Sequence, residues 1–259
     1  MGAPLRPRAP KGLGGDQVEG RQAVRELLIA GRRRVREVWM AEGSDDSPIL
    51  SEIEELATDA RVPIRSVTRD QLFHEARTEA PQGVLAFADE IAEMEFDDML
   101  RARGTRLPFL LFVDQVTDPQ NLGALLRSAD GAGVTGVVLP RHRAVHVTPT
   151  VTKAAAGAVE RVPMALVGGL PTAMLDAKKA GAWIIGLDAD GPDDLYSLAH
   201  LGDEPLVVVI GAEGEGLSRL VRARCDSIAR IQLKGALSSL NASVAGAIAM
   251  FEMGRHRSS

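Results

Sequence analysis

The sequence predicts an α/β protein of two domains joined by a charged linker. Continuous apolar runs such as FLLFVD, residues 109–114, are typical of parallel strands that helices cover on both faces. Stretches with helical periodicity separate these runs, so strand and helix alternate through the C-terminal part of the chain. Residues 89–106, DEIAEMEFDDMLRARGTR, are charged and weakly periodic, and a smaller alternating region precedes them. Together these observations predict two α/β units.

Composition limits the classes of function. Of the 259 residues, 45% are hydrophobic and only 3% are aromatic, so we expect a core of Leu, Val, Ile and Ala. Cys225 is the one cysteine, which excludes an internal disulfide, and we expect it to be a packing or surface residue rather than a nucleophile. No apolar run is long enough to span a membrane and the basic N-terminus has no apolar signal-peptide core, so we expect a cytoplasmic protein. The net charge of -5 argues against a globally basic nucleic-acid binder but allows a local basic face.

The smaller region has the pattern of a compact α/β domain over residues 17–90. Residues 1–16, rich in Pro, Gly and Arg, are expected to be a disordered basic arm. Helical spacing first appears at Val24, Leu27 and Leu28, and again at Ile49 and Ile53. The segments with strand character are 35–40, 62–67 and 83–88. Residues 91–107 form the linker.

The larger domain is predicted to occupy residues 108–259. Its strand-like runs are residues 109–114, 136–140, 182–188, 205–211 and 227–233. The helical stretches between and after them are residues 121–132, 150–159, 170–180, 217–223 and 241–254. No internal repeat is visible. Because strand and helix alternate, we expect a sheet with helices on both sides.

Three loops follow strands of this domain and carry the polar residues that chemistry requires. They are VDQVTDPQNLGALLRSADGAG, IGAEGEGLS and LKGALSSLN. In open α/β sheets, ligands bind at the carboxyl ends of the strands, where these loops lie. The second loop is not a phosphate loop, because it lacks the Lys and Ser/Thr of that motif and because Glu213 and Glu215 would repel phosphate. A neutral or cationic ligand suits it better.

Together the loops are more specific than any one of them. NLGALLRSADGAG, GAEGEGLS and SSLNASVAGAIAMFE, in that order, resemble the three motifs of the SpoU (TrmH-type) RNA 2′-O-ribose methyltransferases of the SPOUT superfamily. VEGRQAVRELL through APQGVLAFAD resembles the family's N-terminal L30e-like RNA-binding domain. The resemblance spans about residues 17–255. It is closest to the bacterial 23S rRNA guanosine-2′-O-methyltransferase subgroup.

The resemblance implies a fold and a cofactor. The family's C-terminal domain is a parallel sheet with a deep trefoil knot, here at residues 211–241, that creates a bent pocket for S-adenosylmethionine. The adenosine part is held largely by backbone groups. The positions that correspond to these groups and to the apolar walls are Gly211, Ile231, Leu240, Leu139, Ala212 and Leu233, with Pro140 beside them.

The implied reaction moves a methyl group from a sulfonium to a ribose 2′-oxygen and requires no metal. In-line alignment and removal of the hydroxyl proton are the tasks of the protein. Arg127 matches the family's central arginine; it acts either as a perturbed base or by binding a phosphate next to the target, which is physically easier because guanidinium stays protonated. Asn121 orients Arg127 or the ribose, or only caps the next helix. Glu213 orients an arginine or contacts substrate, and Ser239 and Asn241 hydrogen-bond the cofactor or the ribose, Asn241 also being placed to cap a helix.

The resemblance also implies two macromolecular partners. The family forms homodimers through the last helix, with the Arg127 side facing the other protomer's cofactor. RNA is the second partner, and the candidate contacts in the first domain and the arm are Arg21, Arg32, Arg33, Arg34, Arg36 and Lys11.

Three hypotheses follow. The first is methylation of a guanosine ribose in 23S rRNA. The second keeps the chemistry on tRNA or another rRNA nucleoside, as in antibiotic-resistance relatives. The third is a non-catalytic RNA-binding protein, against which the intact motif set argues.

Overall fold

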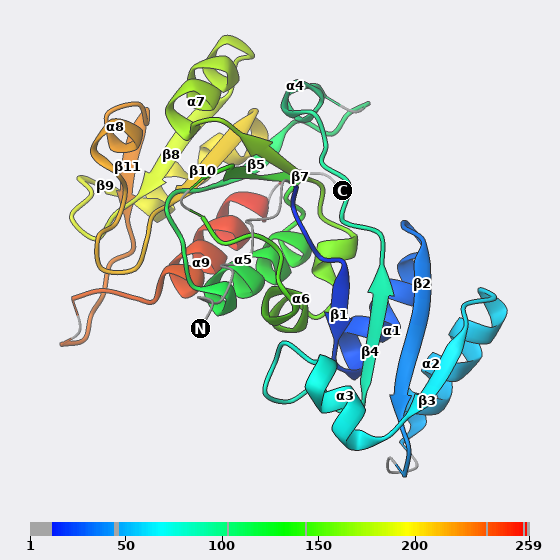
Figure 1. Cartoon of the computed structure of the whole chain (residues 1–259). Coiled ribbons are helices and arrows are strands. Elements are labelled where there is room, and N and C mark those ends of the chain that lie inside the picture. The colour runs from blue at the N-terminus through cyan, green and yellow to red at the C-terminus, as the bar shows by residue number, and fades with distance from the viewer. Residues whose placement is uncertain are drawn as a thin grey trace, which may run out of the picture.

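The structure, a computed structural model, describes residues 12–43, 47–102, 104–142, 144–236, 238–255 and 257. It contains two separate sheets, and Figure 1 shows the smaller, N-terminal one at the lower right and the larger one at the upper left. Each sheet has its own apolar core. The α/β architecture predicted from the sequence is confirmed.

The N-terminal sheet has four strands in the order β1 (Gln17–Glu19), β4 (Val84–Ala88), β2 (Val35–Ala41) and β3 (Ile64–Val67). Only the β2–β3 pair is parallel. The amphipathic helices α1 (Arg21–Ala30) and α2 (Pro48–Asp59) bury Val24, Leu27 and Ile53 against one face. The short helix α3 (Arg69–Glu75) packs Leu72 against the other face.

The large sheet has seven parallel strands in the order β7-β6-β5-β10-β8-β11-β9. Their bounds are β5 (Phe109–Val113), β6 (Gly136–Pro140), β7 (Met164–Val167), β8 (Trp183–Leu187), β9 (Asp193–Asp194), β10 (Leu206–Ile210) and β11 (Ser227–Arg230). From β5 the chain builds outward to β7 and then crosses to β8 on the other side, and β10 later inserts between β5 and β8. The direction of building therefore reverses next to β5, which is where α/β sheets open a crevice for ligands.

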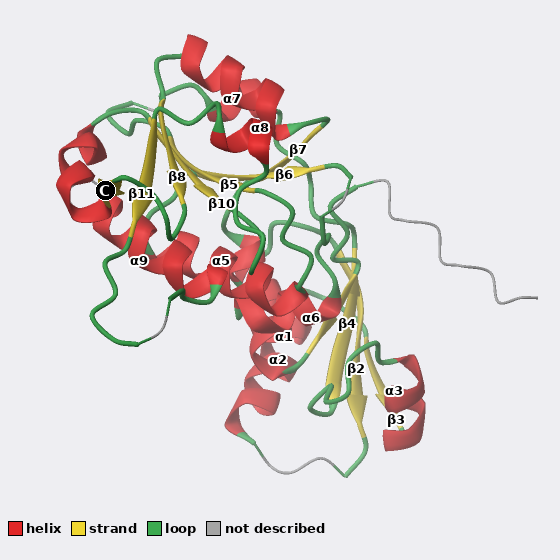
Figure 2. Cartoon of the chain, turned by 90° about the vertical axis from the view of Figure 1, so that its left-hand side faces the viewer, coloured by secondary structure: helices red, strands yellow, loops and turns green. Residues whose placement is uncertain are grey.

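Helices cover both faces of this sheet, and Figure 2 shows them above and below it. One layer holds α5 (Pro119–Gly131), α6 (Pro149–Ala155) and α9 (Ala242–Gly254), with the 3-10 helices η1 (Ala158–Glu160) and η2 (Leu195–Asp203). The other layer holds α4 (Phe96–Met99), α7 (Leu170–Lys179) and α8 (Arg219–Arg222). The strands are buried on both sides, as their continuous apolar runs predicted.

Several elements differ from the sequence prediction. The strands β1, β7 and β9 and the helix α3 were not predicted, because their short runs fall below the length at which periodicity is legible. The strand predicted over residues 227–233 ends at Arg230. The trefoil knot implied by the resemblance concerns chain threading and stays a prediction.

The two domains are docked through the last residues of the predicted arm. Residues 1–11, with Lys11, lie outside the described residues, but residues 12–16 are not a disordered arm. Leu13 is fully buried in the core of the large domain, and its carbonyl accepts from the Val147 N–H at 2.8 Å. Gly14 has φ +86, and a Cβ there would lie 2.7 Å from the Val147 carbonyl oxygen, so only glycine fits this close approach.

Candidate active site

Three polar side chains from distant parts of the chain meet at the carboxyl edge of the large sheet. Asn121 belongs to α5, Glu213 follows β10, and Asn241 precedes α9. The amide Nδ2 of Asn241 donates to Oδ1 of Asn121 at 2.9 Å and to Oε2 of Glu213 at 3.3 Å. Nδ2 of Asn121 donates to the same carboxylate oxygen at 3.2 Å. One carboxylate oxygen thus holds two amides in fixed orientation.

Asn121 does not cap α5, which corrects one of its two predicted roles. Asp118 is the N-cap and accepts from the N–H groups of Gln120 and Asn121, each at 3.2 Å. Pro119 occupies the first helical position, where its missing N–H is not needed. The side chain of Asn121 is therefore free to turn toward Glu213, and it is buried there. An Asp directly before Pro is the signal that would have identified the cap from sequence.

Asn241, in contrast, does cap a helix, as predicted. Its Oδ1 accepts from the Ser243 N–H at 2.9 Å, from the Val244 N–H at 3.4 Å and from the Ser243 hydroxyl at 2.6 Å. The cap uses the oxygen and the contacts with Asn121 and Glu213 use the nitrogen, so the two roles are simultaneous.

The loop after β10 is held in a tight turn. The N–H of Ala212 donates to the Gly216 carbonyl at 3.1 Å, and the N–H of Gly216 donates back at 2.9 Å. A Cβ on Gly211 would lie 2.2 Å from the carbonyl carbon of Gly216, so a side chain there would open the turn. The buried carboxylate of Asp114, which sequence reasoning missed, accepts from the Ser218 N–H at 2.7 Å and ties the loop to β5.

These loops enclose a cavity of about 840 Å³. This is within the size range of small-molecule and cofactor sites. The apolar residues Leu187, Ile210 and Ile231 line it together with the glycine-rich loop, residues 211–216. The sequence-predicted residues that line it are Gly211, Ala212, Glu213, Ile231, Leu233, Ser239, Leu240 and Asn241.

Leu139, predicted as a possible cavity wall, is not among the residues that line this cavity. It lies in β6 and its side chain is fully buried in the core of the large domain. Its burial reflects packing of the strand between two helix layers.

The cavity has an acidic balance. Asp188, Asp190, Glu213 and Glu215 line it, against two basic residues, Arg230 and Lys234. Arg230 donates to the carbonyl of Gly191 at 2.5 Å. A ligand with cationic groups and an apolar aromatic part fits this lining, and S-adenosylmethionine has a sulfonium, an ammonium and an adenine. The residues present therefore fit the cofactor that the resemblance implies.

Arg127 does not join this cluster within its own chain. It lies on α5 roughly one and two-thirds turns beyond Asn121, which places it on another face of the helix. Its side chain is exposed, and it does not line the cavity. Asn121 therefore does not orient Arg127 of the same chain.

The arginines predicted to contact RNA have different environments. Arg33 is an interior residue: it forms an ion pair with Glu160 at 2.6 Å, and the two side chains are 7% and 3% exposed. Arg21 donates to the Gln82 carbonyl at 3.1 Å. Arg32 and Arg34 are exposed, and Arg36 is exposed beside Asp89.

Cys225 is outside the cavity lining and packs against the second core of the large domain. Burial raises the pKa of its thiol to about 12, so the thiol stays protonated at neutral pH. The described ranges contain no group of three or more His, Cys, Asp and Glu side chains placed to hold a metal ion. Nor does any helix within them have the length and apolar character of a membrane span.

A parallel sheet with a loop-lined, acidic cavity at its carboxyl edge defines a ligand-binding α/β protein. The SpoU rRNA Methylase family matches residues 108–251, and a second family, described as RNA 2′-O ribose methyltransferase substrate binding, matches residues 17–94. The chain belongs to the SpoU rRNA methylase family, which confirms the prediction from the three motifs.

Relatives cover nearly the whole chain. A protein of Shewanella oneidensis named 23S rRNA (guanosine-2′-O-)-methyltransferase RlmB is 39% identical over 250 residues, which are 94% of this chain and 98% of that protein. Its Pseudomonas aeruginosa counterpart of the same name is 38% identical over 245 residues, 93% of this chain and 97% of the other. The crystal structure of the SpoU methyltransferase AviRb from Streptomyces viridochromogenes with its cofactor AdoMet has a TM-score of 0.77 and 26% identity, and covers 92% of this chain and 89% of that one.

Proposed function

We propose that this chain, an S-adenosylmethionine-dependent RNA ribose 2′-O-methyltransferase, modifies a guanosine of 23S rRNA in the cytoplasm. The observation that carries the proposal is the hydrogen-bonded set of Asn121, Glu213 and Asn241, of which Glu213 and Asn241 line the acidic cavity. The target is supported by the relatives that are named for this reaction and that match this chain over nearly its full length.

The hydrogen bonds of the cluster indicate which atoms are left for the substrate. Both N–H groups of the Asn241 amide are used, one by Asn121 and one by Glu213. Asn121 retains one N–H, and Oε1 of Glu213 accepts from no described residue. These two groups are available to bind the ribose, and the carboxylate oxygen is placed to accept a hydrogen bond from its 2′-hydroxyl.

The bound cofactor would supply the electrophilic methyl group. Gly211, Ala212, Ile231, Leu233 and Leu240 would hold its adenosine part through main chain and apolar contact. Ser239, exposed at the cavity, would bind the methionine end.

The proposed enzyme is a homodimer in which Arg127 serves the partner's site. Helix α9 leaves Val244 46% and Phe251 53% exposed, two turns apart on one face. The exposed surface of the neighbouring α5 offers Arg127, with Gly131 beside the Phe251 ring. Pairing of this apolar surface with a second copy would bury it and bring Arg127 of one chain toward the other chain's cavity. Arg127 would then bind a phosphate next to the target, the easier of its two predicted roles.

Mapping of ribose methylation tests the reaction and its target together. Purified protein, S-adenosylmethionine and 23S rRNA from a strain that lacks the gene are incubated, and 2′-O-methyl nucleosides are located by mass spectrometry. We expect one new methylated guanosine, and none with Arg127→Ala. Methylation of tRNA instead would favour the second hypothesis. Absence of methylation together with absence of cofactor binding by calorimetry would favour the non-catalytic RNA-binding protein.

Mixing two inactive variants tests the shared site. Arg127→Ala and Asn241→Ser homodimers are combined under conditions that exchange subunits. If Arg127 acts across the interface, hybrid dimers contain one intact site, and a one-to-one mixture regains about a quarter of wild-type activity. Sedimentation of Phe251→Asp as a monomer would support the interface. No recovery from subunits shown to exchange would contradict catalysis across it.

A further inference from the structure

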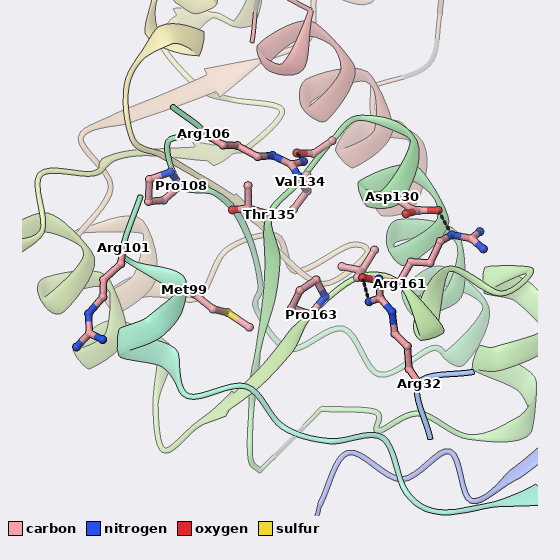
Figure 3. A pocket seen from close by; sticks show the side chains of 12 residues that line it. Arg32, Met99, Arg101, Arg106, Pro108, Asp130, Val134, Thr135, Arg161 and Pro163 are labelled. Carbon is pink, nitrogen blue, oxygen red and sulfur yellow. Dashed lines mark hydrogen bonds and ion pairs between the residues drawn. The ribbon is translucent and has the colours of Figure 1, made fainter. Parts of the chain in front are cut away.

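A second cavity, of about 380 Å³, lies at the amino edge of the large sheet, opposite the edge with the cofactor cavity. It forms where three strands begin: Pro108 precedes β5, Thr135 precedes β6, and Pro163 precedes β7. Figure 3 shows Arg106 at one end and the neighbouring Arg32 and Arg161 at the other, with Arg101 extending away from them. Its position separates this cavity from the proposed chemistry.

The charge of this cavity is opposite to that of the cofactor cavity. Arg32, Arg101, Arg106 and Arg161 line it, against one acidic residue, Asp130. Arg161 donates to Asp130 at 2.9 Å and to Glu26 at 2.6 Å, and its hydrogen bond to Asp130 is the main cause of the raised pKa of Arg161. Asp130 is therefore paired with Arg161, and Arg101 forms an ion pair with Asp98 at 2.8 Å, so the positive charge of the cavity comes mainly from Arg32 and Arg106.

Arg32 and Arg106 donate hydrogen bonds to carbonyl groups rather than to carboxylates. Nη1 of Arg32 donates to the Arg161 carbonyl at 2.9 Å, and Nη2 of Arg106 donates to the Gly133 carbonyl at 2.8 Å. Neither has an ion pair with an acidic side chain among the residues that the structure describes. Because carbonyl groups are neutral, the positive charge of both arginines stays uncompensated. A guanidinium carries five N–H donors, so several donors of each arginine remain for an anion.

The basic surface continues beyond this cavity. An adjoining cavity of about 460 Å³ shares Arg106 and Gly133 with it and adds Arg255 and Arg257, against one acidic residue, Asp203. Arg257 donates to carbonyls of the chain, Pro108 among them, and Arg255 is exposed and forms an ion pair with Glu252 at 2.8 Å. The two adjoining cavities together form a basic strip. Such a strip fits several phosphates of a polymer better than one small anion.

The strip also begins beside Arg127. Asp130, which lines the cavity, lies three positions after Arg127 on α5, and residues with this spacing are neighbours on a helix surface. An RNA strand that Arg127 contacts would therefore have its flanking phosphates within reach of the cavity. We propose that Arg32 and Arg106 bind backbone phosphates of the RNA strand next to the methylated nucleotide. This inference rests on the proposed function.

The salt dependence of RNA binding tests the inference. Binding of 23S rRNA to the full-length protein is measured by filter retention at several KCl concentrations. For the Arg32→Gln/Arg106→Gln double variant we expect weaker binding. The slope of the logarithm of the binding constant against the logarithm of the salt concentration should be smaller in magnitude by about 1 to 2, because binding releases fewer counterions when a phosphate contact is lost. The Arg106→Lys variant should keep most of the contribution that Arg106 makes to the salt slope, since a phosphate contact requires the positive charge.

Arg219→Gln is the matched control, because it removes the same charge from an exposed residue of α8, on the far part of the sheet. It should leave the slope unchanged, and cofactor affinity should be unchanged in all variants. If the double variant is unstable, the Arg106→Gln variant alone gives the same readout. Its fold should be retained, since Arg106 donates only to the carbonyl of Gly133 in a turn.

A wild-type slope in the Arg106→Gln variant would overturn the inference, as would an equal loss in Arg219→Gln. The proposed function fails separately, if the wild-type protein binds RNA but methylates none of it.

Discussion

At the residue scale, Asn241 combines a structural and a functional task in one amide. Its oxygen caps α9 and its nitrogen holds Asn121 and Glu213. Serine retains capping ability but cannot reach the other two side chains, whereas alanine loses both functions.

We therefore expect Asn241→Ser and Asn241→Ala to lose methylation alike, while the serine variant is about 1 kcal/mol more stable. Urea unfolding and single-turnover methylation measure the two effects. Wild-type turnover in the serine variant would show that the link to Glu213 is not needed.

Cys225 is a residue whose environment, rather than its type, decides its reactivity. Burial is the main cause that raises its pKa to about 12 from an ordinary 9.0. We expect iodoacetamide to modify the folded protein at pH 8 far more slowly than the urea-unfolded protein, as followed by mass spectrometry. Equal rates would contradict the burial.

The same shift predicts a pH effect on stability. Above the ordinary thiol pKa, the unfolded chain releases a proton that the folded chain keeps, so the unfolded state gains stability. The free energy of unfolding should therefore fall as pH rises from about 9 toward 12, and Cys225→Ala should lack this component.

At the scale of elements, the turn after β10 depends on the absence of a side chain at Gly211. The Cβ of an alanine there would collide with main chain of Gly216, and main chain cannot move aside cheaply. Gly235 is a matched control, since a Cβ at that position meets no atom within 4 Å.

We expect Gly211→Ala to weaken S-adenosylmethionine binding by at least about tenfold, because the turn forms the cavity wall. Gly235→Ala should bind like the wild type. Isothermal titration calorimetry compares the two, and equal affinities would mean that the turn adapts.

At the scale of the whole molecule, an interior ion pair fixes the domains relative to each other. Arg33 binds Glu160 through two nitrogens, at 2.6 and 2.9 Å, and also donates to the Gly15 and Asp89 carbonyls. This arrangement joins the chain before β1 and directly after β4 of the first domain to η1 of the large domain. The adjacent residue, Arg32, lines the basic cavity, so the ion pair lies next to that cavity.

Removal of one partner leaves a buried charge. We expect Glu160→Ala to lower the free energy of unfolding by about 3–5 kcal/mol and the Arg33→Met/Glu160→Leu pair to recover most of it. Denaturant unfolding measures both variants. A loss below about 1 kcal/mol in Glu160→Ala would mean that water reaches the pair.

The sequence by itself determined the alternation of strands and helices, the cap at Asn241, the family and the loops that form the cavity. These follow from patterns within a few residues, such as periodicity and glycine spacing, which local sterics and burial impose. Tertiary structure decided which polar residues are available to contact a ligand or RNA. Arg33 and its neighbour Arg32 look alike in sequence, but Glu160, 127 positions away from Arg33, takes one into the interior. Leu139 is buried and Arg127 is turned from its own cavity for the same physical reason: partners come from distant segments, and a local pattern carries no information about them.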